Sequence, residues 1–431
     1  MSGAPAGLPP CQHGPVSTYG LDGVLPWHQA RHVAATCARP LPCVAARLDE
    51  AGGSVLGAPL VTVQDDPPAD SATSDGFAFC GEGPWLLTAP DADVVTRGHA
   101  RAVRAGEPIP RHTDAVLGAQ QAAAFERADG RTVITARDPL TGLPDEMVRP
   151  EFGEGIVRQA TVSGAGHALV PEGSPVTPAV LALAAAAGHD ALGIIRPPVV
   201  GVLVLGNHLL DRGLPRHGRV RDALGNTVPA FIGTLGGRGN PAVRASDTID
   251  LLLREIDDAA VDVLITTGST APGPDNHLRQ VLRDLNARWL VDGVSVTPGA
   301  QMLLARLPDG RFLIGLPGDP MAALAGLVTL ASPLIRCLRG DPADGRTRTA
   351  VLLDETPPAD YAEDTALVPV RLEVSSAATL ARPLAASGPA GLAGWATADA
   401  LAVVPPGAGL RGDVVDVLDP WGRAGMRDLG A

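Results

Sequence analysis

Residues 262–276 decide the fold, and they read Asp262-Val-Leu-Ile-Thr-Thr-Gly-Ser-Thr-Ala-Pro-Gly-Pro-Asp-Asn276. Val263–Ile265 is a short apolar run that is typical of a buried strand. After the turn, His277–Leu285 carries apolar residues at the i, i+3, i+4, i+7 spacing of one helix face, and Asp275 or Asn276 is the expected N-cap. A strand, a turn rich in glycine and hydroxyls, and a helix start direct backbone N–H groups at one point, which favours anion binding.

The same alternation of strand and helix surrounds this stretch. Val199–Leu205 and Phe312–Leu316 read as further buried strands, and Ser246–Val261 and residues 321–334 read as helices. Solid apolar strands between helices predict a mostly parallel sheet that is covered on both faces. In such a sheet, ligands bind at the carboxyl ends of the strands.

The remaining chain predicts several domains. Residues 1–25 read as a loose tail, and residues 26–51 as a helix that is interrupted by prolines and followed by a strand at 54–63. Short β runs without helical period fill residues 66–170, which indicates an all-β insert. Thr177 is the expected N-cap of a helix that ends at Gly188. The boundaries we predict are a tail at 1–25, an elongated N-terminal domain at 26–65 and 151–196, an insert at 66–150, an α/β domain at 197–340 and a β domain at 341–431.

Composition excludes several classes of function. The 431 residues are 45% hydrophobic with a net charge of −13, which argues against a nucleic-acid surface or a polybasic membrane contact. The chain contains no lysine, so a P-loop lysine and lysine Schiff-base chemistry are excluded. Its five cysteines form no CxxC pair, and residues 1–30 show no signal peptide. The apolar run at 179–187 is too short to span a membrane, so we expect a cytoplasmic location.

Three strand-to-helix turns carry the candidate chemistry. They are Gly206-Asn207-His208, Gly268-Ser269-Thr270 and Pro317-Gly318-Asp319-Pro320, and all should leave carboxyl ends of strands. Their amides and hydroxyls suit a phosphate or an oxyanion, and Asp275 and Asp319 suit Mg²⁺. Turn chemistry alone also explains these residues, one turn at a time. Asp75 stands in a lone Asp-Gly pair, which is typical of a turn. A lone histidine such as His208 is typically a structural residue. The arginines of Arg97–Arg104 and Arg212–Arg221 favour a solvated face over an anion site.

Motifs in this order resemble the MoeA family of molybdopterin molybdenumtransferases, which includes the gephyrin E domain. Asp70–Ala78 resembles the family's Ser-x-Met-Asp-Gly-Tyr-Ala motif, Val200–Leu209 its VAxxxTGDEL segment, and Gly218–Asp222 its GxIxDSN segment. Asp262–Arg279 resembles DxxxTTGGxSxGxxDxxK, and Gly315–Pro320 resembles GLPGNP. The correspondence spans residues 26–420.

The resemblance implies a multidomain fold: a three-layer α/β molybdopterin-binding domain, an inserted N-terminal β domain and a C-terminal β-barrel-like domain. It implies a homodimer whose cleft lies between the α/β domain of one subunit and the β insert of the other, and a contact with the molybdopterin adenylyltransferase. The implied reaction joins molybdate to adenylylated molybdopterin, with Mg²⁺, and releases AMP. Site residues follow from the matching motifs. The catalytic residues are Asp75, Asp262 and Asp275, and the metal ligands are Asp275, Asn276 and Asp319. The ligand-binding residues are Gly206, Asn207, His208, Asp222, Thr267, Gly268, Ser269, Thr270, Pro317, Gly318, Asp319 and Pro320.

Departures from the family pattern keep two further hypotheses open. The acidic pair of TGDEL is Asn207-His208 here, the aspartate of GxxD falls on Asn276, and Ser269 replaces a glycine. A catalytically impaired paralogue that binds the pterin or the cofactor as a carrier is therefore the alternative function. A third hypothesis uses the α/β domain on another nucleotide.

Overall fold

The computed structural model describes residues 23–145, 147–148, 150–216, 218–273, 276–341, 348–375, 378–384 and 388–419. These residues form two compact units. One consists of the described residues between 44 and 194, and the other, the central unit, of residues before 44 and after 194.

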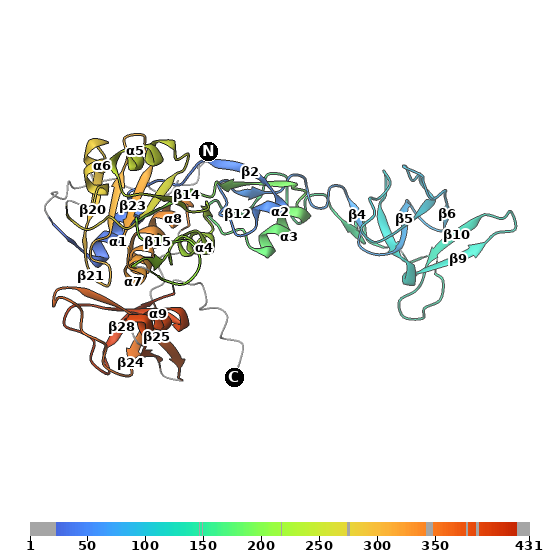
Figure 1. The fold of residues 1–431 in the computed structure, drawn as a ribbon. Helices are drawn as coiled ribbons and strands as arrows, with labels where there is room; N and C mark the ends of the chain where they lie inside the picture. The colour runs from blue at the N-terminus through green and yellow to red at the C-terminus, as the bar shows by residue number, and fades with distance from the viewer. Residues whose placement is uncertain are drawn as a thin grey trace, which may run out of the picture. The chain divides into compact units, whose positions relative to one another are not determined.

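A mixed sheet forms the middle of the central unit (Figure 1). Its strands β14 (Val199–Leu205), β19 (Val263–Thr267) and β23 (Phe312–Leu316) are neighbours and run parallel, which confirms the predicted parallel arrangement. Two short strands extend the β14 edge in parallel, β17 (Arg238–Gly239) and β18 (Val243–Ala245). The other edge is antiparallel, with β22 (Leu303–Arg306) and then β20 (Arg288–Asp292), and this part was not predicted.

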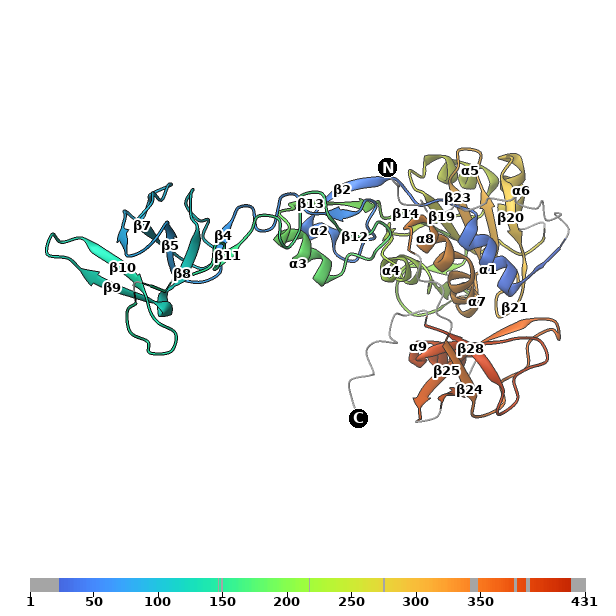
Figure 2. The same ribbon diagram turned by 180° about the vertical axis from the view of Figure 1, so that it is seen from behind.

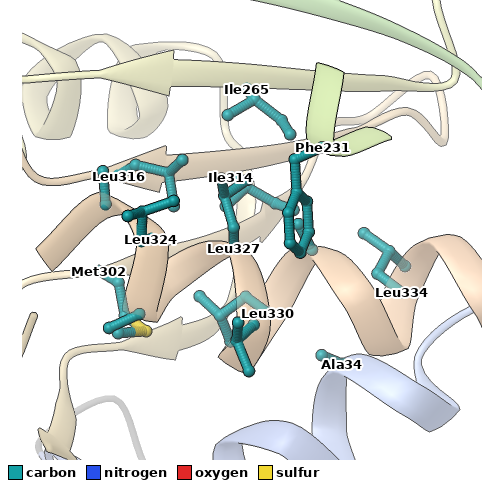
Figure 3. Packing of buried hydrophobic residues seen from close by; sticks show 14 of the residues in the cluster. Ala34, Phe231, Ile265, Met302, Ile314, Leu316, Leu324, Leu327, Leu330 and Leu334 are labelled. Carbon is teal, nitrogen blue, oxygen red and sulfur yellow. The ribbon is translucent and has the colours of Figure 1, made fainter. Parts of the chain in front are cut away.

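Helices cover both faces of this sheet, because alternate strand residues point to opposite sides. Ile265 and Ile314 pack under helices α1 (Trp27–Thr36), α4 (Thr227–Thr234), α7 (Pro320–Gly326) and α8 (Ser332–Leu338). Figure 3 shows these two side chains facing Leu327 and Leu330, with Ala34 of α1 nearby. Leu264 and Leu313 point the other way, against α5 (Ile249–Asp258) and α6 (Leu278–Asp284). The three-layer α/β prediction is therefore confirmed.

Two local predictions in this unit need correction. The N-cap of α6 is His277, without a side-chain capping bond, so Asn276 does not cap this helix, and Asp275 lies outside the described residues. The predicted helix at 321–334 is a longer stretch in which a π-helical turn (Leu327–Ala331) joins α7 to α8. By length and composition Pro320–Leu338 matches a membrane span, but 83% of its apolar window is buried inside the protein, as in a core helix.

The C-terminal part of the central unit is a closed five-stranded barrel. Its strands pair in the order β25 (Thr365–Val374), β26 (Thr379–Pro383), β24 (Arg348–Leu352), β28 (Val414–Leu418) and β27 (Ala400–Val404), and β27 pairs again with β25. The short strand β21 (Val294–Thr297) joins β25 in parallel and also pairs with β1 (Leu25–Pro26). Helix α9 (Gly388–Thr397) lies beside this barrel in both views (Figure 2), and the sequence did not predict it.

The other unit contains the predicted β insert. A six-stranded sheet has the order β8 (Ala115–Gly118), β5 (Gly76–Cys80), β7 (His99–Val103), β6 (Trp85–Leu87), β10 (Thr132–Ala136) and β9 (Ala122–Glu126). The pairs β3 (Leu60–Val61) with β12 (Ala168–Val170), and β4 (Ser71–Ala72) with β11 (Ile156–Val157), connect it to α3 (Pro178–Ala186). Thr177 caps α3, as predicted, since its hydroxyl accepts a hydrogen bond from the amide of Val180 at 3.3 Å.

The predicted helix at 26–51 is only partly correct. Trp27–Thr36 is helical, but Cys43–Arg47 is the strand β2, paired with β13 (Ala191–Ile195), and only Leu48–Ala51 returns to helix as α2. Helix α1 packs in the core of the central unit, whereas we had predicted that residues 26–65 belong to one N-terminal domain.

Candidate functional site

The three predicted turns lie at one edge of the central sheet. Gly206–His208 follows β14, Gly268–Thr270 follows β19, and Pro317–Pro320 follows β23. The register pairs Val204 with Thr267 and Thr267 with Leu316, so the three strands end at the same level. Because parallel strands have their carboxyl ends on one side, the structure brings these turns together as the sequence predicted.

Gly268 lies between the ends of β14 and β23. Its amide donates a hydrogen bond to the carbonyl of Leu316 at 2.8 Å, and its φ of 88° lies in the left-handed region. A Cβ at Gly268 would lie 2.9 Å from the carbonyl oxygen of Leu205, and a Cβ at Gly318 would lie 3.7 Å from the Gly268 Cα. A side chain at position 268 therefore cannot fit without moving the end of β14.

Ser269 and Thr270 show how the central turn is held. Ser269 has a φ of 59°, which an L-residue rarely adopts, and its hydroxyl oxygen is buried without a hydrogen-bond partner. Thr270 is 3% exposed, and its carbonyl accepts a hydrogen bond from Nε of Arg279 at 2.9 Å. Arg279 also pairs with Asp292, so one arginine ties the turn to β20. Sequence reasoning did not single out Arg279, although it stands at the lysine position that ends the motif.

Asp319 has a clear local function as a helix cap. Its Oδ1 accepts a hydrogen bond from the amide of Ala322 at 2.9 Å, and Pro320 occupies the first turn of α7. This satisfies one of the free amides at the helix start. The side chain is exposed at the strand-end edge, so its second oxygen is available to a ligand. Its role as a metal ligand stays a prediction, as does that of Asn276.

Within the described residues, no group of three or more His, Cys, Asp or Glu side chains is arranged to hold a metal ion. Asp275, the remaining predicted ligand, lies outside the described residues. Magnesium binding at this edge therefore stays a prediction.

Asp222 is buried, and it organises the entry to α4. Its carboxylate accepts hydrogen bonds from the amides of Leu224 and Gly225 at 2.9 Å each, and from Arg244 Nε and Nη2 at 3.0 and 2.7 Å. Burial alone raises the pKa of this carboxyl group, but the two amides and Arg244 outweigh burial and hold the pKa below its usual value. These contacts give Asp222 a structural role, and contact with a ligand stays a prediction.

Asp262 lies at the opposite end of the sheet from the turns. It precedes β19, and six residues at about 3.3 Å each place Gly268 roughly 20 Å further along the strand. Its carboxylate accepts hydrogen bonds from Arg196 at 3.0 and 2.7 Å and from the amide of Val199 at 2.8 Å. These contacts join the starts of β14 and β19 and give Asp262 a structural role, and its catalytic role stays a prediction.

Asp75 belongs to the other unit, where it precedes β5. Its Oδ1 accepts a hydrogen bond from the amide of Ala105 at 2.9 Å, and its carbonyl accepts one from Ala119 at 2.9 Å. The residue is exposed, so its carboxylate is accessible. Its catalytic role stays a prediction.

Three family models match successive parts of the chain. The MoeA N-terminal region (domain I and II) matches residues 25–188, a probable molybdopterin binding domain matches 201–337, and the MoeA C-terminal region (domain IV) matches 350–419.

Among named relatives, a molybdopterin molybdenumtransferase of Staphylococcus aureus is 24% identical over 70% of this chain and 72% of its own length. That of Bacillus subtilis is 30% identical over 56% of this chain and 54% of its own. A crystal structure of a molybdopterin biosynthesis MoeA protein from Pyrococcus horikoshii has the same fold, with a TM-score of 0.71, 23% identity, and coverage of 92% of this chain and 98% of that one.

Proposed function

The chain belongs to the MoeA family, and on this premise we propose that it inserts molybdate into adenylylated molybdopterin and releases AMP. The relatives named molybdopterin molybdenumtransferase support a transferase in molybdenum cofactor biosynthesis. The observation that carries the proposal is that three turns leave one edge of the sheet, with Gly268 packed against the end of β14 and against the turn after β23.

This arrangement of turns suits both anions that the reaction requires. A phosphate group and a tetrahedral oxyanion both take hydrogen bonds from backbone amides and hydroxyls, and turns at strand ends supply these donors. In the proposed reaction the two dithiolene sulfurs of the pterin become ligands of molybdenum, and the adenylate leaves. The turns would hold both anions in place while this exchange proceeds.

Magnesium dependence stays a prediction of the family resemblance. Mg²⁺ commonly binds through one or two carboxylates together with substrate phosphates. Asp319 offers one such oxygen, because its other oxygen caps α7. When bound, the ion would supply positive charge to the phosphate groups, and activity with and without chelator measures whether it is needed.

An insertion assay tests the proposed function. Purified protein is mixed with molybdate and adenylylated molybdopterin, and both AMP and molybdenum cofactor are measured. Gly268→Ala should abolish product formation, because its Cβ would lie 2.9 Å from the Leu205 oxygen. Gly233→Ala in α4 is the matched control, since no atom lies within 4 Å of its Cβ position. If the unmodified protein forms neither product, the proposed activity is wrong.

The carrier hypothesis rests on the replaced acids of the motifs, because Asn207-His208 and Asn276 stand where the family pattern has acidic residues. A carrier binds the pterin but forms no AMP, and the same assay distinguishes the two functions when pterin binding is measured in parallel. Asp75→Asn adds a second criterion. It should reduce turnover in an enzyme and leave binding by a carrier unchanged.

A homodimer also stays a proposal, and helix α3 supports it. All nine residues of α3 are apolar, yet Ala182, Leu183, Ala185 and Ala186 are exposed. A helix that is apolar on all sides is normally buried. Because the helix carries no charge, two copies can pair through the same face without repulsion. Leu183→Arg should therefore yield monomers in analytical ultracentrifugation, and a dimer that persists contradicts this interface. The cytoplasmic location and contact with the adenylyltransferase stay predictions.

A further inference from the structure

An exposed loop leaves the carboxyl end of β14, beside the candidate site. Its base is formed by β15 (Leu209–Leu210) and β16 (Val220–Arg221), which run parallel, with hydrogen bonds from the amide of Val220 to the carbonyl of His208 and from the amide of Asp222 to the carbonyl of Leu210, each 3.0 Å long. Its described residues between 211 and 221 are all exposed. Within this loop, Arg216 and Arg219 pair in the antiparallel sense, and we call residues 216–221 the arginine hairpin, because they include Arg216, Arg219 and Arg221.

These three arginines share one face of the hairpin. Arg216 and Arg219 form a bridge with reciprocal backbone hydrogen bonds of 3.2 and 3.0 Å. Side chains directly opposite in such a pair lie on the same face, with Cβ atoms about 5 Å apart. Arg221 follows Arg219 by two residues of extended backbone, so it points to that face as well. Like charges placed directly opposite each other destabilise a hairpin, and a bound anion would remove this repulsion.

Neither of the two carboxylates that flank the hairpin neutralises this face. Asp211 and Asp222 each form an ion pair with Arg244, with N···O distances of 3.0 and 2.7 Å. Among the described residues, Arg216 and Arg221 have no side-chain partner. The guanidinium groups therefore stand exposed in a chain whose net charge is −13.

One contact directs this face toward the strand ends. Nη2 of Arg219 donates a hydrogen bond to the carbonyl of Leu209 at 3.1 Å. Leu209 lies only three residues after Gly206, the first residue of the β14 turn. The cationic face therefore borders the edge of the sheet that the three turns leave.

We propose that Arg216, Arg219 and Arg221 bind the phosphate groups of a nucleotide-linked substrate at the edge of the candidate site. Guanidinium groups match phosphate oxygens through paired N–H donors, and the phosphates of a nucleotide-linked ligand are negatively charged at neutral pH. Three guanidinium groups suit a ligand with one or two phosphates. This inference rests on the proposed function, because it names where that substrate's phosphates bind. The sequence alone had favoured a solvated face for these arginines.

The test measures binding of inorganic pyrophosphate to the full chain by calorimetry, at low salt and with chelator present. Arg216→Ala/Arg221→Ala removes the two guanidinium groups without a partner and should weaken binding about tenfold. The matched control is Arg283→Ala/Arg288→Ala, which removes equal charge from exposed positions at the amino-end side of the same sheet. The control should change affinity less than about twofold, because charges more than a Debye length away are screened.

A lysine pair separates charge from geometry. Arg216→Lys/Arg221→Lys keeps both charges but loses the paired donors, so its affinity should fall between the wild type and the alanine pair. Binding of AMP should show the same order, whereas an order seen only with pyrophosphate identifies a free phosphate site and contradicts the nucleotide-linked ligand. Equal weakening in the hairpin pair and the control pair overturns the inference, and so does unchanged affinity in the hairpin pair. Unchanged affinity in the hairpin pair would favour an acidic protein surface as the partner of these arginines.

Failure of the proposed function gives a different result. A protein that binds pyrophosphate through the hairpin but forms no AMP in the insertion assay retains the phosphate site and lacks the enzyme activity. If the wild type forms AMP but the Arg216→Ala/Arg221→Ala variant binds pyrophosphate with unchanged affinity, the protein has the enzyme activity and lacks this phosphate site.

Discussion

Replacing Ser269 by glycine is expected to stabilise the central unit. Ser269 has a φ of 59° and a buried hydroxyl without a partner. A left-handed backbone costs an L-residue about 1–2 kcal/mol, and a buried unpaired polar group costs about 1–3 kcal/mol. Glycine removes both costs but loses roughly 0.5–1 kcal/mol through the greater freedom of the unfolded chain. We therefore expect a net gain of about 2 kcal/mol in the free energy of unfolding.

Two further substitutions separate these contributions. Ser269→Ala removes the hydroxyl but keeps a Cβ in the left-handed region, so its gain should be about 1 kcal/mol. Asn286→Gly is the control, since Asn286 has a similar φ of 53° after helix α6. Asparagine tolerates this conformation, so the control should gain less than about 0.5 kcal/mol.

The measurement is hydrogen exchange of the β19 amides, followed by mass spectrometry at several denaturant concentrations. Exchange reports the opening of this segment without assuming that the two units unfold together. The affinity for molybdate is measured on the same variants. If the hydroxyl donates to an anion at this turn, both Ser269 variants bind molybdate more weakly and the control does not. Unchanged protection in Ser269→Gly would falsify the reasoning about strain, and unchanged molybdate affinity would remove Ser269 from the site.

Four further substitutions test three of the aspartates. Asp319→Ala removes the helix cap and should lower the free energy of unfolding by about 1 kcal/mol. Asp319→Ser keeps a capping oxygen but removes the negative charge. A fall in activity of the serine variant at saturating Mg²⁺ therefore measures the effect of the lost charge alone. Asp222→Asn should lower the free energy of unfolding by about 2 kcal/mol at pH 7. A larger loss is not expected, because the partner Arg244 is 37% exposed and solvent screens the ion pair. The folded pKa of Asp222 is lowered, so its contribution is complete above the unfolded value of about 3.9 and disappears as pH falls through the folded pKa. Denaturation midpoints of the variant and the wild type should therefore converge in acid and separate above about pH 5. Asp262→Ala should destabilise the unit by about 2 kcal/mol, since it leaves the Val199 amide and the partly exposed Arg196 without their acceptor, while the folded fraction keeps its affinity for molybdate.

Strands that are buried on both faces were predictable from sequence. Val199–Leu205 and Phe312–Leu316 appear with the predicted bounds, because continuous apolar runs of that length have few alternatives inside a sheet. Elements that depend on distant partners were not predictable. Cys43–Arg47 has an alanine-rich, helix-like composition, and it becomes a strand because it pairs with Ala191–Ile195. Local propensity is outweighed there by a contact about 150 residues away in sequence.

Helix α9 was missed for a related reason. Its sequence, Gly-Pro-Ala-Gly-Leu-Ala-Gly-Trp-Ala-Thr, contains three glycines and a proline, which disfavour an isolated helix. Trp395 is 1% exposed and belongs to the same apolar cluster as the central sheet. Burial of a large aromatic side chain therefore stabilises a helix that propensity alone would not form.

Within the candidate site, sequence predicted the turns but not the roles of the acids. Asp262 and Gly268 belong to one motif, yet they lie at opposite ends of β19, because a strand of five residues separates them. In a parallel sheet, the residue before a strand faces the amino edge, and the residue after it faces the ligand edge. A motif that spans a strand must therefore contain both kinds of residue. Asp262 loses contacts with Arg196 when it is replaced, whereas Gly268 loses the close approach of two neighbouring turns. Stability measurements are the correct test for the first residue, and ligand binding is the correct test for the second.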